Sequence, residues 1–195
     1  MSTPHHPDRH TQALRRSGAA GVHDHRPTRG EAEREAVRDQ EEDGAVTDIE
    51  TLARRIAEEA HSGQLDKAGA PYLGHVRRVV DQLDDPLDRA VAWLHDVLED
   101  TDWTTDELYG AGQAAHPARW PVVVGNVSML THRRDEPRSA YYARVRDSHR
   151  AVRVKLADVA DNSDPERLAL LDEATRKRLT EKYAKAREAL TGVRS

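Results

Sequence analysis

The sequence contains no cysteine and no phenylalanine, and aromatic residues make up only 4% of its 195 residues. Without cysteine, neither a disulfide nor a thiolate zinc site can form, so histidine, carboxylate and water must hold any metal ion. That ligand set suits Mn, Fe, Zn, Co or Mg better than a soft metal. The core must therefore be built from leucine, valine and alanine with a few tryptophan and tyrosine side chains.

Long apolar runs are also missing. Runs such as Val122 to Val124 fall far short of the roughly 20 apolar residues that a membrane span needs. The N-terminal residues MSTPHHPDRHTQALRR contain no apolar segment typical of a secretory signal, so we expect a cytoplasmic protein without a membrane partner. A formal net charge of -5 argues against non-specific binding to nucleic acid, because that binding needs a basic face.

The first 45 residues differ in composition from the rest of the chain. They are rich in proline, glycine, arginine, histidine and glutamate and have almost no apolar periodicity, which predicts a disordered polar tail over 1–45. The HHPDRH segment could bind stray metal ions, although an ordinary disordered tail accounts for it as well. We expect one folded domain over 46–195.

Helical periodicity and capping signals fill the remainder of the chain. The TDIE segment at Thr47–Glu50 fits a capping box that opens a first helix, which stops near Gly63. Pro71 opens a second helix, and Asp84–Pro86 caps a third that is expected to run to about Asp100. Further helices are expected from a capping box at Thr104–Glu107, from Pro117, over Glu136–Val145, over His149–Asn162, from Asp164–Pro165, and from Asp172 to Leu190. Alternating runs and internal repeats are missing from the sequence, so the predicted fold is all-α, a single compact helical bundle.

The third predicted helix ends in polar side chains that its apolar face does not explain. His95 and Glu99 lie four residues apart and share a face, and Asp96 and Asp100 share the adjacent one. A helix C-terminus already carries partial negative charge, so three carboxylates there suggest that a cation offsets them. A solvated acidic helix end would also account for this stretch, since charge runs are usually solvated.

Two other predicted helices carry a histidine or an acid among apolar residues. His75 lies beside the inward face of the second helix, and Asp158 lies in the middle of an apolar face. A buried carboxylate needs a partner, which is either a basic side chain such as an arginine or a metal ion. Together, His75, His95, Asp96 and Asp158 form a reasonable ligand set for a divalent ion, with positions left for water.

The order His … His-Asp … Asp resembles the signature of the HD-domain metal-dependent phosphohydrolases. The segments AHSGQLDKAGAPYLGH, LHDVLEDTDWTTDEL and VKLADVADN are similar to motifs of the RelA/SpoT-type domain, which hydrolyses the 3′-pyrophosphate of (p)ppGpp. The resemblance extends from about Ile49 to Asn162. It implies hydrolysis of a phosphate or pyrophosphate ester, a small-molecule nucleotide or phosphate ester as partner, and one divalent metal ion, usually Mn²⁺.

The resemblance also implies roles for individual residues. The implied metal ligands are His75, His95, Asp96 and Asp158. The implied catalytic pair, which positions and activates water, is Glu99 and Asp100. The implied substrate-binding residues are Lys67, Tyr72 and Asn162, and Thr131 matches a threonine of the family. Lys155 is a further candidate for binding phosphate charge, because it lies three residues before Asp158.

Some positions depart from the family pattern. The family loop commonly carries Arg-Lys, with the arginine stacking on guanine, whereas this chain has Asp66 before Lys67. A carboxylate cannot stack like a guanidinium, and it repels phosphate. The Arg-Leu-His run after the last ligand is here Val159-Ala160-Asp161. We therefore expect hydrolysis to be retained on a substrate that need not be (p)ppGpp.

Two alternative functions would keep the same fold without hydrolytic activity. The domain could be a catalytically weak nucleotide-binding or regulatory module, which the loss of basic residues favours, although Glu99 and Asp100 would then serve no evident purpose. Alternatively, a metal ion could only stabilise a structural bundle. Turnover of phosphate esters would distinguish an enzyme from a binding module. A melting temperature that falls strongly on chelation, in a protein that binds no ligand, would indicate the structural role.

Overall fold

The computed structural model describes residues 48–66 and 69–192. The predicted tail over 1–45, the domain boundary after it, Thr47 and Lys67 therefore lie outside the described residues. Within the described ranges the structure is helical, and the only strand-like pairing there is one isolated bridge between Leu65 and Pro71. The prediction of an all-α fold is confirmed.

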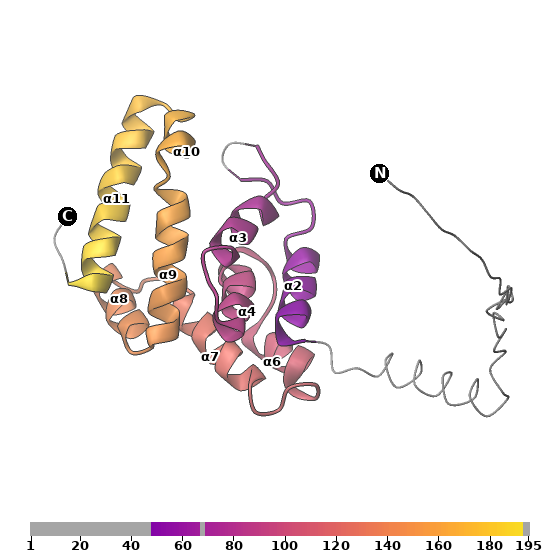
Figure 1. Cartoon of the computed structure of the whole chain (residues 1–195). Helices are drawn as coiled ribbons and strands as arrows, with labels where there is room; N and C mark the ends of the chain where they lie inside the picture. Colours follow the sequence, from indigo (N-terminus) through magenta and orange to yellow (C-terminus); the bar gives the residue numbers. More distant parts are fainter. Residues whose placement is uncertain (1–47, 67–68, 193–195) are drawn as a thin grey trace, which may run out of the picture. The chain divides into compact units, whose positions relative to one another are not determined.

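One helix lies at the centre of this arrangement. The described helices are, in chain order, α2 (Ile49–Ala60), α3 (Leu73–Val80), α4 (Pro86–Leu94), α5 (Val97–Asp100), α6 (Thr105–Gln113), α7 (Trp120–Leu130), α8 (Arg138–Arg146), α9 (His149–Asn162), α10 (Pro165–Ala169) and α11 (Glu173–Thr191). The central helix is α4, which contacts α2, α3, α7 and α9. Beyond it, α9 lies alongside α11 (Figure 1) and also contacts α3, α7 and α8. Helices α3, α4 and α9 therefore meet at one place. Of the predicted metal ligands, His75 lies on α3 and Asp158 on α9, while His95 and Asp96 directly follow α4.

Several predicted helix starts are confirmed by their caps. Thr104 and Glu107 form the reciprocal capping box of α6, and Asp172 caps α11. Asp85 caps α4, with Pro86 at the first helical position, where a missing backbone N–H costs no hydrogen bond. The bounds of α9 agree with the prediction at both ends.

Other predicted starts are wrong. The cap of α2 is Asp48, whose carboxylate accepts a hydrogen bond from the Thr51 amide at 3.4 Å, whereas the prediction placed the cap one residue earlier. Helices α3 and α7 begin two and three residues later than predicted, after turns. Helix α8 begins at Arg138 because Pro137 disfavours helical geometry at the preceding residue, Glu136.

The third predicted helix is interrupted. Helix α4 ends at Leu94, the chain turns through His95 and Asp96, and α5 begins at Val97. Asp96 has φ -108° and ψ -1°, away from regular helical values. Glu99 and Asp100 therefore belong to a separate short helix, so the argument that placed three acids at the C-terminus of one long helix is wrong.

The core is formed by apolar residues from most of these helices. The apolar residues that recur at helical spacing in α2 and α3 are predicted to face inward, and all except the partly buried Ala60 are buried: Ile49, Leu52, Ala53, Ile56, Ala57, Val76, Val79, Val80 and, just after α3, Leu83. Trp120 is fully buried, and its indole nitrogen donates a hydrogen bond to the Leu108 carbonyl at 2.7 Å. In the part of the chain that the structure describes, no helix combines the length and the apolarity that crossing a membrane requires.

Helix α6 packs against α7 where Gly112 meets the ring of Trp120. A Cβ atom at position 112 would lie 2.3 Å from Cδ2 of Trp120, whereas one at Gly110 in the same helix would meet nothing within 4 Å. We expect Gly112→Ala to lower the free energy of unfolding by about 1–3 kcal/mol, because overpacking forces the ring or the backbone to move. Gly110→Ala is the matched control and should be neutral or stabilising by up to about 1 kcal/mol. Urea unfolding measures both, and equal effects at the two positions would contradict this packing.

An ion pair joins α2 to α4. Both oxygens of Glu50 lie 2.8 Å from guanidinium nitrogens of Arg89, and Trp93 donates a hydrogen bond to Glu50 at 3.3 Å. The hydrogen bond from Arg89 lowers the pKa of Glu50 below its ordinary value of 4.5, and burial opposes this only in part.

We expect Glu50→Gln to lower the free energy of unfolding by about 1 kcal/mol at neutral pH. Because the folded-state pKa is lowered, this contribution is fully present above pH 4.5 and is lost as the pH falls through the folded-state value. The difference between the two proteins should therefore shrink in acid. Urea unfolding across this pH range tests the prediction, which a difference that grows in acid would refute.

Candidate metal centre and active site

Four polar side chains from three parts of the fold converge on one point. Ligand atoms of His75, His95 and Asp96 all lie within 4.8 Å of one another. Oδ1 of Asp158, on α9, lies 3.3 Å from Nε2 of His75 and 3.8 Å from Nε2 of His95. Nε2 of His95 is also 2.9 Å from Oδ2 of Asp96. The structure therefore brings together all four residues predicted as metal ligands.

The break between α4 and α5 makes this convergence possible. In a continuous helix, neighbouring side chains point about 100° apart, so His95 and Asp96 would diverge. The turn at Asp96 brings its carboxylate back beside the imidazole of His95. The apolar part of α4 up to Leu94 stays in the core, and the two polar residues follow directly after it.

Hydrogen bonds hold both imidazoles in an orientation suited to metal binding. Nδ1 of His95 lies 2.7 Å from the Ala92 carbonyl, which can only accept, so Nδ1 donates and Nε2 is the nitrogen that faces the cluster. Nε2 of His95 is buried and, although it lies 2.9 Å from Oδ2 of Asp96, it forms no hydrogen bond of good geometry with a described residue. Nδ1 of His75 lies 2.7 Å from Oδ2 of Asp161, so Nε2 of His75 is the nitrogen that faces the cluster. Metal-binding histidines are commonly held in this way, by a carbonyl or a carboxylate on the other ring nitrogen.

The electrostatic environment of this four-residue cluster favours positive charge. Burial disfavours a charged imidazole, but the carboxylates of Asp96 and Asp158 outweigh burial and raise the pKa of His95 to about 10. Burial also opposes ionisation of Asp158, yet Lys155 and the two imidazoles hold the pKa of this carboxyl well below its usual range. Two imidazole nitrogens facing two carboxylates form a donor set that fits a divalent cation.

Tyr72 holds two of the acids. Its hydroxyl donates to Oδ2 of Asp96 and lies 3.2 Å from Oδ2 of Asp100, so these two carboxylates share a face, as predicted. Burial and the charge of Asp96 raise the pKa of the Tyr72 phenol, which keeps the hydroxyl protonated as a donor. The same two causes raise the pKa of Asp100. The ring of Tyr72 packs against that of His75, with 5.5 Å between centroids, so this side chain touches both a metal ligand and the second acid of the predicted catalytic pair.

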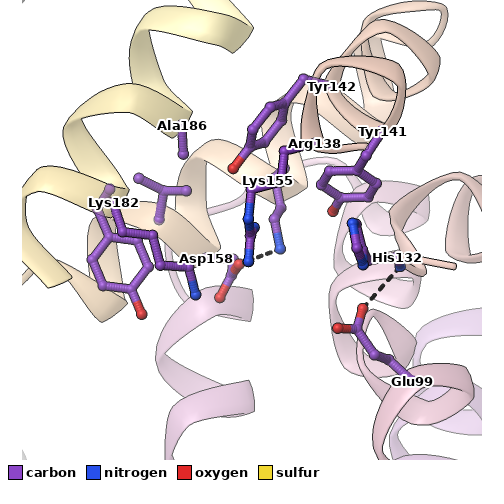
Figure 2. Close-up of a pocket in the computed structure, with 11 residues that line it drawn as sticks. Glu99, His132, Arg138, Tyr141, Tyr142, Lys155, Asp158, Lys182 and Ala186 are labelled. Atoms are coloured by element: carbon purple, nitrogen blue, oxygen red, sulfur yellow. Dashed lines mark hydrogen bonds and ion pairs between the residues drawn. The ribbon is translucent and has the colours of Figure 1, made fainter. Parts of the chain in front are cut away.

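Glu99 faces the loop that follows α7. Its Oε2 accepts a hydrogen bond from the backbone amide of His132 at 2.9 Å (Figure 2). Thr131 directly precedes this amide and ends α7, and its hydroxyl donates to the Val127 carbonyl at 3.0 Å. One carboxylate oxygen of Glu99 is therefore anchored by the backbone.

A cavity of about 100 Å³ lies beside the cluster, with Glu99 and Asp158 in its wall (Figure 2). The same wall carries three cations and three tyrosines: Arg138, Lys155, Lys182, Tyr141, Tyr142 and Tyr183. Lys155 pairs with Oδ2 of Asp158 at 2.8 Å. Basic side chains gathered beside a candidate cation site are suited to binding a phosphate group.

The predicted substrate residues are partly brought to this site. Tyr72 and Lys155 contact the ligands Asp96 and Asp158. Asn162 does so as well, since its amide nitrogen donates to Oδ1 of Asp158 at 2.5 Å. Lys67 lies outside the described residues. The described members of the predicted set therefore contact the metal ligands, and of these members Lys155 also lies in the wall of the cavity.

Sequence reasoning gave no role to Lys182 and Tyr183. Both lie on α11, whose dense charge is typical of a solvated helix, and no local signal distinguishes the two positions. It also missed Asp161, which the structure places against His75. An acid in the last turn of an otherwise apolar helix face was the available signal for that residue.

Comparison with known proteins adds a sequence relative. No family model matches the chain. Over 125 residues the chain is 36% identical to the guanosine-3′,5′-bis(diphosphate) 3′-pyrophosphohydrolase of Haemophilus influenzae, in a match that covers 55% of this chain. The chain spans only 17% of the length of that protein. The resemblance read from the motifs is therefore confirmed by sequence similarity.

A solved structure of a metazoan orthologue of SpoT shares the fold. That protein is described as hydrolysing ppGpp and acting in starvation responses. The match has a TM-score of 0.60, with 23% identical residues, and covers 75% of this chain and 88% of the other. The two chains therefore have the same helical architecture.

Metal binding should be visible as thermal stabilisation. We expect Mn²⁺ at about one hundred times its dissociation constant to stabilise the protein by about 2.7 kcal/mol, and a chelator to reverse the gain. His95→Gln should abolish the response, because the lone pair of Nε2 is lost. Asp106→Asn, which removes an exposed acid on α6, is the control and should keep it. Calorimetry with and without Mn²⁺ measures these changes in stability. A melting temperature of the unmodified protein that does not change with Mn²⁺ would refute the metal site.

Proposed function

We propose, on the premise that the chain is a relative of the RelA/SpoT-type HD hydrolases, that it is a metal-dependent phosphohydrolase that cleaves a phosphate or pyrophosphate ester of a nucleotide. The observation that carries the proposal is the cluster of two imidazoles and two carboxylates beside a basic cavity with Glu99 in its wall. The 3′-pyrophosphate of a guanosine alarmone is the first substrate to consider, because the bacterial relative is named for that reaction. The cytoplasmic location stays a prediction.

The proposed metal ligands are His75, His95, Asp96 and Asp158, and the proposed ion is Mn²⁺, which accepts imidazole and carboxylate ligands. When bound, such an ion polarises a phosphoryl oxygen and favours ionisation of water at neutral pH. Both effects match a reaction in which water attacks phosphorus.

Glu99 is the proposed general base. Its Oε2 is held by the His132 amide, which leaves the other oxygen to take a proton. As the oxygen of water bonds to phosphorus, the ester P–O bond breaks, its electron pair leaves with the departing oxygen, and the proton of water passes to Glu99. Asp100, held by Tyr72, orients the water. A base of this kind contributes on the order of 10²–10⁴-fold to the rate.

The cavity is proposed to bind the phosphate end of the substrate. Its volume of about 100 Å³ is well below the roughly 300–1,000 Å³ of a site that encloses a whole ligand. Arg138, Lys155 and Lys182 in its wall would offset phosphate charge, and Tyr72 and Asn162 lie beside the ligands of the ion. The base and sugar would then lie outside this cavity, and Lys67 stays a predicted substrate-binding residue.

The direct test is release of phosphate and pyrophosphate in the presence of Mn²⁺. The panel contains ppGpp, NADPH, nucleoside mono-, di- and triphosphates, and a generic phosphate ester. We expect turnover of at least one nucleotide. Turnover of ppGpp alone would identify an alarmone hydrolase, and turnover of other nucleotides alone would mean a changed specificity. If the protein binds the metal ion but releases no product from any compound of the panel, the proposal is overturned in favour of a binding module.

Two variants separate chemistry from metal binding. Glu99→Gln should keep Mn²⁺ affinity and lose about 10²–10⁴-fold in kcat, because the base is gone while the ligands remain. Asp96→Ala should lose both metal retention and turnover. Isothermal titration with Mn²⁺ and product release measure the two properties independently. An active, metal-free Asp96→Ala protein would refute the proposed mechanism.

A further inference from the structure

Asp161 joins a metal ligand to two arginines. It lies near the end of α9 and is only 7% exposed. Its Oδ2 is 2.7 Å from Nδ1 of His75, and its Oδ1 accepts a hydrogen bond from Nε of Arg78 at 2.6 Å. Arg167 on α10 also donates to Oδ2 of Asp161. One buried carboxylate is thus shared by an imidazole and two guanidinium groups.

Arg167 also contacts the loop between α2 and α3. Its second terminal nitrogen lies 3.5 Å from Oδ2 of Asp66. The loop is closed by hydrogen bonds from the Asp66 amide to the Ala70 carbonyl at 2.7 Å and from the Tyr72 amide to the Gln64 carbonyl at 2.9 Å. Arg167 therefore bridges Asp66 of this loop on one side and Asp161 on the other.

The chemistry of this group determines how His75 is held. An ionised carboxylate only accepts hydrogen bonds, so Asp161 makes Nδ1 of His75 the donor and leaves the lone pair on Nε2. Arg78 and Arg167 supply two positive charges against the negative charges of Asp161 and Asp66, so the carboxylate can stay charged although it is buried. The imidazole is then fixed in direction as well as in tautomer.

Two departures from the family pattern meet at this arginine. Asp66 stands where the family loop carries arginine, and Asp161 stands where the family has histidine after the last ligand. In the structure the two acids lie on either side of Arg167. The two changes therefore belong to one arrangement rather than being separate losses of basic groups.

We infer that Asp161 is a positioning residue that directs Nε2 of His75 toward the metal ion, and that Arg167 connects this residue to the loop between α2 and α3 through Asp66. The inference rests on the proposed function in taking the cluster around His75 to be the metal centre. Asp161 and Arg167 then affect the affinity for the metal ion and, through that affinity, the rate of turnover. Neither residue contacts the reacting atoms.

The test is isothermal titration of Mn²⁺ into the full chain and its variants, without substrate. Asp161→Asn keeps the shape of the side chain but turns one acceptor oxygen into a donor, and it should weaken Mn²⁺ binding by about 10–100-fold. Arg167→Met should weaken binding less, and Asp66→Asn less again, because each lies one contact further from the ion. Glu50→Gln, which removes a carboxylate–arginine pair between α2 and α4, is the matched control and should leave affinity unchanged.

A double-mutant cycle distinguishes this role from a merely structural one. If Arg167 acts through Asp161, Arg167→Met should add little to the loss of affinity already present in Asp161→Asn. Independent, additive losses would overturn the connection, and wild-type affinity in Asp161→Asn would overturn the positioning role. If circular dichroism shows that Asp161→Asn does not fold, the Mn²⁺ affinities of Arg167→Met and Asp66→Asn test the connection instead. Wild-type affinity in both variants would refute it.

The affinity readout separates this inference from the proposed function. A protein that binds Mn²⁺ and hydrolyses nothing on the panel refutes the proposed function, whereas the ranking of affinities among the variants is unaffected. Conversely, turnover by the wild type together with unchanged Mn²⁺ affinity in Asp161→Asn refutes the inference and leaves the proposed function in place.

Discussion

A buried negative charge at Asp158 ties the packing of this protein to its candidate chemistry. The carboxylate lies within the face of α9 that packs on α3 and α4, and a buried carboxylate is costly unless it is paired. Oδ1 faces the imidazoles of His75 and His95, while Oδ2 pairs with Lys155. The helices that bury the core therefore also bring together the groups that compensate this charge, so the site depends on the same contacts as the fold.

The interruption after Leu94 solves a geometric problem that a regular helix could not. The apolar run of α4 must stay in the core, whereas His95 and Asp96 must face one point although they are neighbours in sequence. A short turn meets both requirements, and the separate α5 then directs Glu99 to the loop after α7 and Asp100 to Tyr72. The acids are thereby divided between the metal ligands and the proposed handling of water.

Local sequence patterns predicted those features of the fold and the site that depend on the spacing of residues along the chain. Apolar periodicity predicted the inward faces of α2 and α3, capping chemistry predicted the starts of α4, α6 and α11, and a histidine and acids among apolar residues predicted the metal ligands. The break at His95 was not predictable in this way, because apolar residues continue at helical spacing on both sides of it. Lys182 in the cavity wall and Asp161 beside His75 depend on contacts between segments far apart in sequence, which no local pattern reports.

The position of Arg167 changes how the acid in the loop should be understood. Read alone, Asp66 is a carboxylate that replaces an arginine and repels a phosphate substrate. In the structure it lies 3.5 Å from a guanidinium nitrogen of Arg167, which also bonds to Asp161. An arginine of α10 thus lies against the acid of the loop and shares its positive charge between Asp66 and Asp161. The effect of residue 66 on substrate choice therefore depends on residues 161 and 167 as well, and it cannot be deduced from that position alone.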